Sequence, residues 1–564
     1  MQSSKILTGL LLAAVATLAG AQSKPSPTNL HLPPTADKAA QVIDRASLEA
    51  PIRFLSDDLL EGRGVASRGD QTARLYLATT LQLLGYQPGG PEGSWQQTFD
   101  MVGIATHAPD TWSFKAGGKT VDLKRWDEFS ASALNQETTA TLKDAELVFV
   151  GYGIQAPEYQ WDDFKGMDLK GKVLVMMNND PDWDPKLFEG NRRLYYGRWT
   201  YKYESAARQG AAGAIIIHTT PSAGYPWQVV QTSWSGEQFE LPKAGEPRIQ
   251  VAGWATEDAT RRLLQAAGQD LDKLVQQAKS RDFKPVPLGI TTSLDLTNEI
   301  HRVKTANVLG LLPGSDPKLK DEVVILSAHH DHLGVGAPDK TGDKIYNGAV
   351  DNASGCATIL AIAKAFAALP QHPKRSILIA FVAAEEQGLL GSAYLARHPP
   401  FPPGKIAANV NYDSVNVIGR TRDFSYIGLG KSTLDQVVQA LAAKQGRTLK
   451  GELYPDRGFF YRSDQFNFAK IGVPALYLKP GTEVIGKPAG WGQEQAADYE
   501  AHRYHQPSDQ FNPNWPYDGM IEDARLGFLA SLSIAENPTL PAWNPGDEFE
   551  AARKKALGEV AKGK

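Results

Sequence analysis

Five residues spread between positions 329 and 505 have side chains that can bind a metal ion. They are His329, Asp351, Glu386, Asp413 and His505. Imidazole nitrogens and carboxylate oxygens are ligands that zinc accepts. Five ligands with three carboxylates are too many for one tetrahedral zinc, but they suit two zinc ions about 3.5–4 Å apart with one carboxylate between them. The residue types therefore predict a two-metal hydrolytic site.

Two further carboxylates accompany this set. Glu385 directly precedes one of the predicted ligands, where hydrolysis needs a general base. Asp331 follows His329 by two residues, so on an extended chain both side chains point the same way. We expect the Asp331 carboxylate to accept a hydrogen bond from the ring nitrogen of His329 that does not bind metal, which fixes the tautomer. His330 faces the opposite side under the same rule, and His332 is not needed for a complete ligand set.

Apolar runs predict the strands that position these residues. From residue 305 onward, strands over 323–326, 377–383, 406–412 and 473–478 alternate with helices over 353–369 and 433–444. This alternation indicates an α/β fold, with a mostly parallel or mixed sheet covered by helices on both faces. His329, the Glu385–Glu386 pair and Asp413 each follow a strand, and open α/β sheets bind ligands at the carboxyl ends of their strands. Asp351 precedes a helix, where it binds metal, caps that helix or does both.

The N-terminus has the features of a secretory signal peptide. Lys5 precedes an apolar run that ends near Leu18, and the residues up to Ala21 form a small-residue cleavage site. The run is shorter than the ~20 apolar residues that a membrane span needs. We expect an exported protein, periplasmic or secreted, that is cleaved near Ala21 and has no membrane anchor.

Composition excludes several classes of protein. A net charge of −4 over 564 residues gives no electrostatic case for nucleic acid as a partner. The 42% hydrophobic and 22% charged content are those of a soluble globular protein. Cys356 is the only cysteine, so the chain has no internal disulfide, and we interpret it as a buried inert thiol. The oligomeric state is not indicated.

Composition shifts and strand signals divide the chain into six segments. We expect a signal peptide (1–21), a Pro-rich linker (22–39), the N-terminal part of a catalytic domain (40–140), an inserted smaller α/β domain (141–288), the main catalytic domain (289–545) and a charged tail (546–564). The insert contains no predicted ligand, so we expect metal binding to persist without it. Its aromatic run over residues 195–203 either lines a substrate cleft or packs within the insert.

Several motifs resemble those of the co-catalytic zinc aminopeptidases, which include bacterial leucine aminopeptidases and glutamate carboxypeptidase II. The similar runs are SAHHDHLG (327–334), GAVDNASG (348–355), AEEQG (384–388), NYD (411–413) and YHQPSD (504–509). The resemblance covers about residues 295–540 and, to a lesser degree, 40–100. Residues 145–285 resemble a protease-associated domain inserted before the first metal motif.

The resemblance implies a role for each predicted ligand. Asp351 would bridge two zinc ions, His329 and Asp413 would hold one ion, and Glu386 and His505 would hold the other. It also implies a zinc-exopeptidase-like fold and a peptide substrate. Carboxypeptidases with the same ligand order carry their insertion after the Glu-Glu pair, and the Asp-Asn-Ala-Ser-Gly run favours the aminopeptidases. A carboxypeptidase, a glutaminyl-cyclase-like enzyme and a non-catalytic binding protein on the same fold are the alternatives.

The expected reaction is metal-assisted hydrolysis of a peptide bond. Zinc lowers the pKa of a bound water to about 7. Glu385 takes the proton of that water as it attacks the scissile carbonyl, and returns the proton to the leaving amine. Tyr504 adjoins His505 and either donates a hydrogen bond to the oxyanion or packs beneath the metal site.

Overall fold

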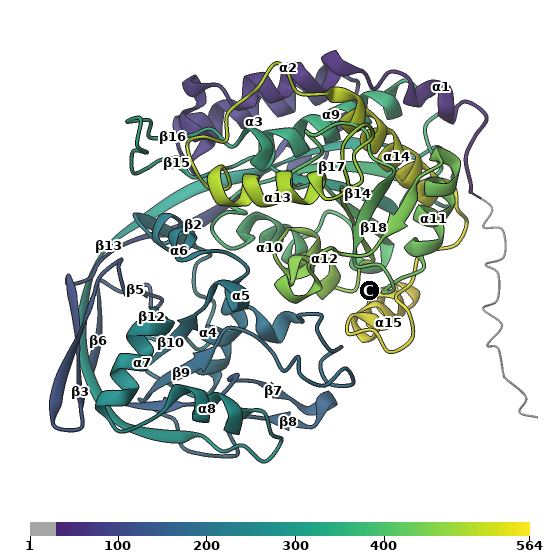
Figure 1. Ribbon diagram of the computed structural model, residues 1–564. Helices are drawn as coiled ribbons and strands as arrows, with labels where there is room; N and C mark the ends of the chain where they lie inside the picture. The colour runs from purple at the N-terminus through teal and green to yellow at the C-terminus, as the bar shows by residue number, and fades with distance from the viewer. Residues whose placement is uncertain (1–29, 564) are drawn as a thin grey trace, which may run out of the picture.

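The computed structural model describes residues 30–563 (Figure 1). The predicted signal peptide and the beginning of the predicted linker lie outside these residues. Between residues 30 and 563, no helix combines the length and the hydrophobicity that crossing a bilayer requires.

A mixed sheet forms the centre of the catalytic part of the chain. Four parallel strands lie in its middle, and antiparallel strands flank them on both sides. In spatial order the strands are β2 (Gln96–His107), β13 (Val286–Leu312), β17 (Ser376–Val382), β14 (Val323–His329), β18 (Ile406–Asn411), β21 (Ala475–Pro480), β19 (Asp423–Ile427) and β20 (Thr448–Lys450), with the short β1 (Gln87–Pro88) beside the end of β13. The predicted α/β class is confirmed.

Helices cover both faces of this sheet, as the continuous burial of its central strands requires. The upper layer in Figure 1 packs its apolar side chains against the sheet in one large core, and comprises α1 (Ala36–Ala40), α2 (Arg45–Leu55), α3 (Arg68–Leu83), α9 (Ser354–Ala367), α11 (Leu434–Gln445) and α14 (Tyr517–Glu536). The opposite layer contains α10 (Leu390–Arg397) and α12 (Gln465–Lys470), whose Leu395 and Phe468 are fully buried against the strands. The tail helix α15 (Glu550–Ala561) follows at this side.

A second lobe lies below and to the left in Figure 1. Its parallel strands β6 (Thr139–Phe149), β9 (Val173–Met177), β10 (Gly213–His218) and β12 (Val251–Thr256) pair in that order. The helices of this lobe are α4 (Trp199–Arg208), α5 (Thr220–Ala223), α6 (Trp227–Ser233), α7 (Glu257–Ala266) and α8 (Leu271–Ala278). The 27-residue strand β13 runs from this lobe into the catalytic sheet, so one continuous strand connects the two.

Strand pairing groups residues 111–133 with the second lobe. The hairpin of β3 (Thr111–Ala116) and β4 (Lys119–Lys124) pairs with β13, and β5 (Phe129–Ala133) pairs with β12. Trp112 and Phe129 are buried in the same core as the strands of this lobe. We therefore propose that the inserted unit begins near residue 108 instead of 141. Its resemblance to a protease-associated domain stays a prediction.

Candidate metal centre

The predicted ligands meet at the carboxyl ends of the central parallel strands. His329 is the last residue of β14, Glu385 and Glu386 follow β17, and Asp413 follows β18. The residue before the glutamate pair, Ala384, has φ 54°, a left-handed conformation that turns the chain directly after the strand. This turn lets two adjacent glutamates approach the same site, which strict strand alternation would forbid.

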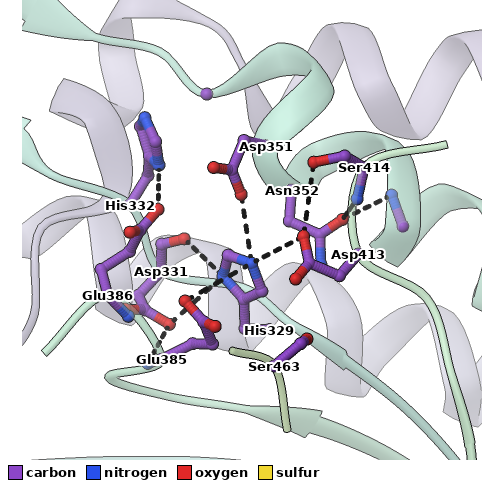
Figure 2. Close-up of polar contacts among 12 residues, drawn as sticks. His329, Asp331, His332, Asp351, Asn352, Glu385, Glu386, Asp413, Ser414 and Ser463 are labelled. Atoms are coloured by element: carbon purple, nitrogen blue, oxygen red, sulfur yellow. Dashed lines mark hydrogen bonds and ion pairs between the residues drawn. The ribbon is translucent and has the colours of Figure 1, made fainter. Parts of the chain in front are cut away.

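Three carboxylates surround the Nε2 atom of His329. It lies 3.2 Å from Oδ1 of Asp351, 3.7 Å from Oδ1 of Asp413 and 3.9 Å from Oε2 of Glu385 (Figure 2). All four side chains are buried or nearly so, and the neighbouring carboxylates raise the pKa of His329 well above its usual value against the effect of burial.

Asp351 has one carboxylate oxygen on each side of the cluster. Its Oδ1 faces His329, whereas Oδ2 lies 3.5 Å from Nε2 of His505. The same nitrogen of His505 lies 3.0 Å from Oε2 of Glu386. The residues thus form two groups that share Asp351. The alternative role of Asp351 as a helix cap is not observed, because α9 begins at Ser354 and its N-cap position is Ala353, without a side-chain cap.

Asp331 contacts its neighbours differently from the prediction. The Nδ1 atom of His329 is 3.2 Å from the backbone carbonyl oxygen of Asp331 and 3.7 Å from its carboxylate, so the backbone carbonyl holds the ring. The carboxylate instead accepts hydrogen bonds from the backbone N–H groups of Glu385 and Glu386, at 3.1 and 3.3 Å. The chain leaves its extended conformation after His329, where β14 ends, and the two-residue alternation no longer applies. Asp331 therefore positions the loop that carries both glutamates.

His332 belongs to the site, although the ligand set predicted from the sequence does not include it. Its Nδ1 atom lies 2.6 Å from Oε1 of Glu386 (Figure 2). His330 points away, as predicted, and its Nε2 atom pairs with Asp70 at 2.9 Å. The three-residue spacing of His329 and His332 is the sequence feature that could have indicated this role. Spacing alone, however, does not tell which carboxylate the His332 imidazole contacts.

Two other residues that the sequence reasoning missed hold Asp413. The hydroxyl of Tyr477 donates to Oδ2 of Asp413 at 3.3 Å, and the Lys479 ammonium donates to its backbone carbonyl oxygen. Both come from β21, the strand beside β18, so sheet pairing brings them to this carboxylate. Burial raises the pKa of Tyr477 and lowers that of Lys479.

Glu385 has the environment of a base beside a metal site. Its side chain is nearly buried. Desolvation and, after it, the negative charges of Glu386 and Asp413 raise the pKa of Glu385 well above that of a free glutamate, while His329 acts in the opposite direction. Tyr504 stacks on His505 with ring centroids 3.9 Å apart, and it lines the adjoining cavity. Both of its predicted roles, packing and hydrogen bonding, are compatible with this position. The thiol of Cys356 is buried, and burial raises its pKa to about 12, as expected for an inert thiol.

A cavity of about 630 Å³ adjoins the cluster, and Asp351, Glu385 and Asp413 form part of its wall. Its apolar lining comprises Val415, Val417, Ile418, Ile427, Leu453, Phe459, Trp491 and Trp515, and its basic lining includes Arg457, Arg462, Lys479 and Arg503. None of the residues that line it lies between 108 and 288. The aromatic run over 195–203 packs instead: Tyr195 lies against Phe466 at 4.9 Å and Trp199 against Trp234 at 5.1 Å.

The second lobe nevertheless contacts a predicted ligand. The hydroxyl of Ser233, at the end of α6, lies 3.1 Å from Nδ1 of His505. Ser233 thus contacts one of the predicted ligands from across the lobe boundary, although the insert supplies no ligand itself. This contact argues against the expectation that metal binding persists without the insert, and that expectation stays a prediction.

Residues 307–528 match the sequence model of peptidase family M28. This part of the chain is similar to members of that family. The M28 segment contains all five predicted ligands together with Glu385, Asp331 and Tyr504. The resemblance to zinc peptidases is thereby confirmed for the catalytic part of the chain.

Curated relatives share part of this chain. The leupeptin-inactivating enzyme 1 of Streptomyces exfoliatus is 27% identical over 266 residues, which cover 46% of this chain and 55% of the relative. A "Probable zinc metalloprotease" of Leptosphaeria maculans is 36% identical over 94 residues, 17% of this chain and 20% of the relative. The chain thus spans about half of the first relative and a fifth of the second.

A solved structure shares the fold. The aminopeptidase from Aneurinibacillus sp. strain AM-1 superposes with a TM-score of 0.51 at 20% identity, over 88% of this chain and 95% of that protein. The superposition extends over both lobes of this chain, so the two-lobed arrangement is not peculiar to this sequence.

Proposed function

We propose that this protein is an exported aminopeptidase that hydrolyses peptides with two zinc ions and Glu385 as general base. The observation that carries the proposal is the division of the Asp351 carboxylate between two ligand groups. One group consists of His329 and Asp413, and the other of Glu386 and His505.

The donor set fits two zinc ions. Among residues 30–563, the Nε2 atom of His329 has no hydrogen-bond partner although it is buried and three carboxylates lie within 4 Å of it. A buried imidazole nitrogen normally has a partner. A cation between these atoms would provide one and would also neutralise carboxylates that otherwise repel each other at close range. Two sets of side chains that share His329 have ligand atoms within 4.8 Å of one another: His329 with Glu385 and Asp413, and His329 with Asp351 and Glu386. Imidazole and carboxylate groups match the ligand chemistry of zinc.

Each residue has a distinct part in the proposed reaction. Bound zinc would activate a water and polarise the scissile carbonyl. Glu385 accepts the water's proton, since its carboxylate lies beside the ligand cluster, 3.9 Å from Nε2 of His329. Asp331 holds the backbone of Glu385 in place. Tyr504, which lines the cavity, would donate its hydroxyl to the developing oxyanion.

The cavity supports a short peptide as the substrate. Its wall carries the metal cluster at one side, where the carboxylates of Glu385 and Asp413 offer partners for a substrate ammonium group. The remaining apolar side chains suit an apolar residue of the substrate. The carboxylates and the apolar wall together fit the amino-terminal residue of a peptide when that residue has an apolar side chain.

A specific observation favours the carboxypeptidase alternative as the second candidate. Arg462 lines this cavity, and its buried Nη1 atom has no hydrogen-bond partner among the described residues. A substrate carboxylate would satisfy it through a charge-assisted hydrogen bond. Lys479 lines the same cavity and adds to its positive charge.

A panel of reporter peptides decides between these candidates. Each peptide is supplied with its amino terminus free or acetylated and its carboxyl terminus free or amidated. An aminopeptidase cleaves only peptides with a free amine, a chelator abolishes cleavage, and added zinc restores it. Cleavage that requires a free carboxylate establishes the carboxypeptidase. Cyclisation of an amino-terminal glutamine without peptide cleavage establishes a cyclase, and zinc binding without turnover establishes a binding protein.

Export is tested separately. We propose that the signal peptide is removed near Ala21 and that the mature protein is periplasmic or secreted. Amino-terminal sequencing of protein from a fractionated culture is expected to begin near Gln22. An intact Met1 in the cytoplasmic fraction would contradict export without affecting the proposed reaction.

A further inference from the structure

The inserted lobe contacts the two loops that carry one of the two proposed metal positions. Ser233 meets Nδ1 of His505 at 3.1 Å, although the two residues are 272 positions apart. Six residues later, the backbone N–H of Phe239 donates to Oε1 of Gln387 at 3.1 Å. Gln387 directly follows Glu386. The segment from Ser233 to Phe239 therefore touches both the Glu386 loop and the His505 loop.

We propose that the inserted lobe completes the metal position formed by Glu386 and His505, and that Ser233 is the positioning residue for His505. The inference rests on the proposed two-zinc function and adds a structural requirement to it. It predicts that the two zinc ions depend unequally on the insert.

The geometry assigns a separate task to each nitrogen of His505. Nε2 faces Glu386 and Asp351, at 3.0 and 3.5 Å. Nδ1 faces the Ser233 hydroxyl, which can accept a hydrogen bond from an Nδ1–H group. That bond selects the tautomer with its free lone pair on Nε2 and fixes the ring plane, as outer partners of metal-binding histidines do. His505 itself has φ 57°, so its backbone conformation depends on support from its surroundings.

Ser233 is held firmly enough to perform this task. Val230 in the same helix is fully buried in the core of the inserted lobe. The indole N–H of Trp227 and the amide of Gln231 both donate to the backbone oxygen of Trp126, at 2.6 and 2.9 Å. The next residue, Trp234, packs edge-on against Trp199 and Trp254, at 5.1 and 6.2 Å. The hydroxyl is thus presented by a packed helix end.

The contacts of the insert are confined to one metal position. Tyr504, which stacks on His505, packs against the same lobe core as Val230. The other position has its own support within the catalytic part: the backbone oxygen of Asp331 holds His329, and Tyr477 holds Asp413. Within residues 30–563, no hydrogen bond joins either of these two ligands to the insert.

Zinc titration of the full-length variant Ser233→Ala tests this inference. Competition with a chromophoric chelator resolves the two binding steps. We expect one zinc ion to bind about 10–100-fold more weakly and the other to bind as in wild type, since loss of an outer partner has effects of that size. The matched control is Ser235→Ala, because this hydroxyl lies in the same segment but bonds to the backbone of Thr232. Ser233→Thr keeps the hydroxyl and is expected to restore the affinity.

If Ser233 only stabilised the fold, Ser233→Ala would lower the melting temperature of the metal-free protein as well. A role in metal binding predicts a different result. The melting temperature of metal-free Ser233→Ala is expected to equal that of the metal-free wild type, with a difference that appears only when zinc is added. Gln387→Ala provides a second variant, and it is expected to weaken the same ion. Wild-type affinity for both ions in both variants would overturn the inference while leaving the proposed function intact. A wild-type protein that is fully active with one zinc ion would instead overturn the proposed function.

Discussion

Nδ1 of His332 lies 2.6 Å from Oε1 of Glu386, and both side chains are almost fully buried. The second oxygen of the same carboxylate, Oε2, lies 3.0 Å from Nε2 of His505. One oxygen of Glu386 is therefore held by the protein while the other remains directed at the proposed metal position. His332 thus orients a ligand without being needed as one.

Replacing His332 by alanine is expected to free Glu386 and to weaken one zinc ion about 10–100-fold. Activity at low zinc falls, and added zinc restores much of it. His332→Asn, which keeps an N–H donor near the position of Nδ1, is the matched control and is expected to lose less affinity. Zinc titrations of the three proteins make the comparison, and equal affinities would show that the contact has no role in metal binding.

Glu385 and Glu386 are adjacent, but we expect their substitutions to impair the protein in different ways. Glu385→Gln cannot accept a proton, so kcat is expected to fall about 10²–10⁴-fold while both zinc ions remain bound. Glu386→Gln is expected to lose one zinc ion, with activity partly recovered by added metal. Elemental analysis and kinetics on both variants separate the roles. Exchanged phenotypes would reverse the two assignments, and full activity in both would remove the catalytic proposal.

Asp351 has a carboxylate oxygen on each side of the cluster, so its loss should affect both metal positions. Asp351→Ala is expected to bind neither ion tightly, whereas Asp413→Ala is expected to lose one. Zinc content after dialysis against metal-free buffer checks this difference. Retention of one full equivalent by Asp351→Ala would argue against its bridging role.

Substitution of Arg462 tests whether the protein prefers substrates with a free carboxylate. Arg462→Met removes the guanidinium with its unpartnered Nη1 atom but keeps a long side chain, so peptides with a free carboxylate near the cleavage site are expected to show a KM about 10–100-fold higher. Amidated peptides are expected to change little. Arg503 also lines the cavity but is paired with Asp498 at 2.8 Å, so Arg503→Met is the matched control. A similar KM for both peptide classes in Arg462→Met would remove the argument for a carboxypeptidase.

His218 in β10 is expected to make the protein less stable in mild acid. Burial lowers its pKa from 6.5 to about 4, and its Nε2 atom lies 3.2 Å from the backbone oxygen of Tyr225. Between these values the unfolded chain binds a proton that the folded protein does not, so stability decreases as pH falls from about 6.5 to 4, by about 3 kcal/mol in total.

Denaturant unfolding at several pH values measures this effect. His218→Gln is expected to flatten the dependence over that interval, since Gln does not titrate. His107→Gln is the control, because the His107 side chain is largely exposed. An unchanged pH dependence in His218→Gln would assign the effect to other groups.

Much of the site was predictable from local sequence. The apolar runs located β14, β17 and β18 within a few residues, since a strand buried on both faces has a continuous apolar pattern. A metal-binding residue type follows each of these strands, and parallel strands bring their carboxyl ends to one edge. The sequence by itself therefore determined that His329, the Glu385–Glu386 pair and Asp413 would meet.

Other contacts were decided by the tertiary structure alone. The strand rule assigned the Asp331 carboxylate to the His329 ring, but β14 ends at His329 and the carboxylate turns to the backbone of the glutamate loop. The partner of His332 depends on the path of that same loop. Residues 111–133 join the second lobe because β13 extends beyond the catalytic sheet and pairs with the β3–β4 hairpin.

Ser233 is the clearest case of a residue whose part only the folded molecule reveals. It stands in a short helix with no motif around it, and its partner His505 is 272 residues further along the chain. Periodicity and spacing describe what neighbouring residues share, such as a buried face or a strand end. They contain no information about how two separately packed lobes dock, and the docking is what places a serine of one lobe on a histidine of the other.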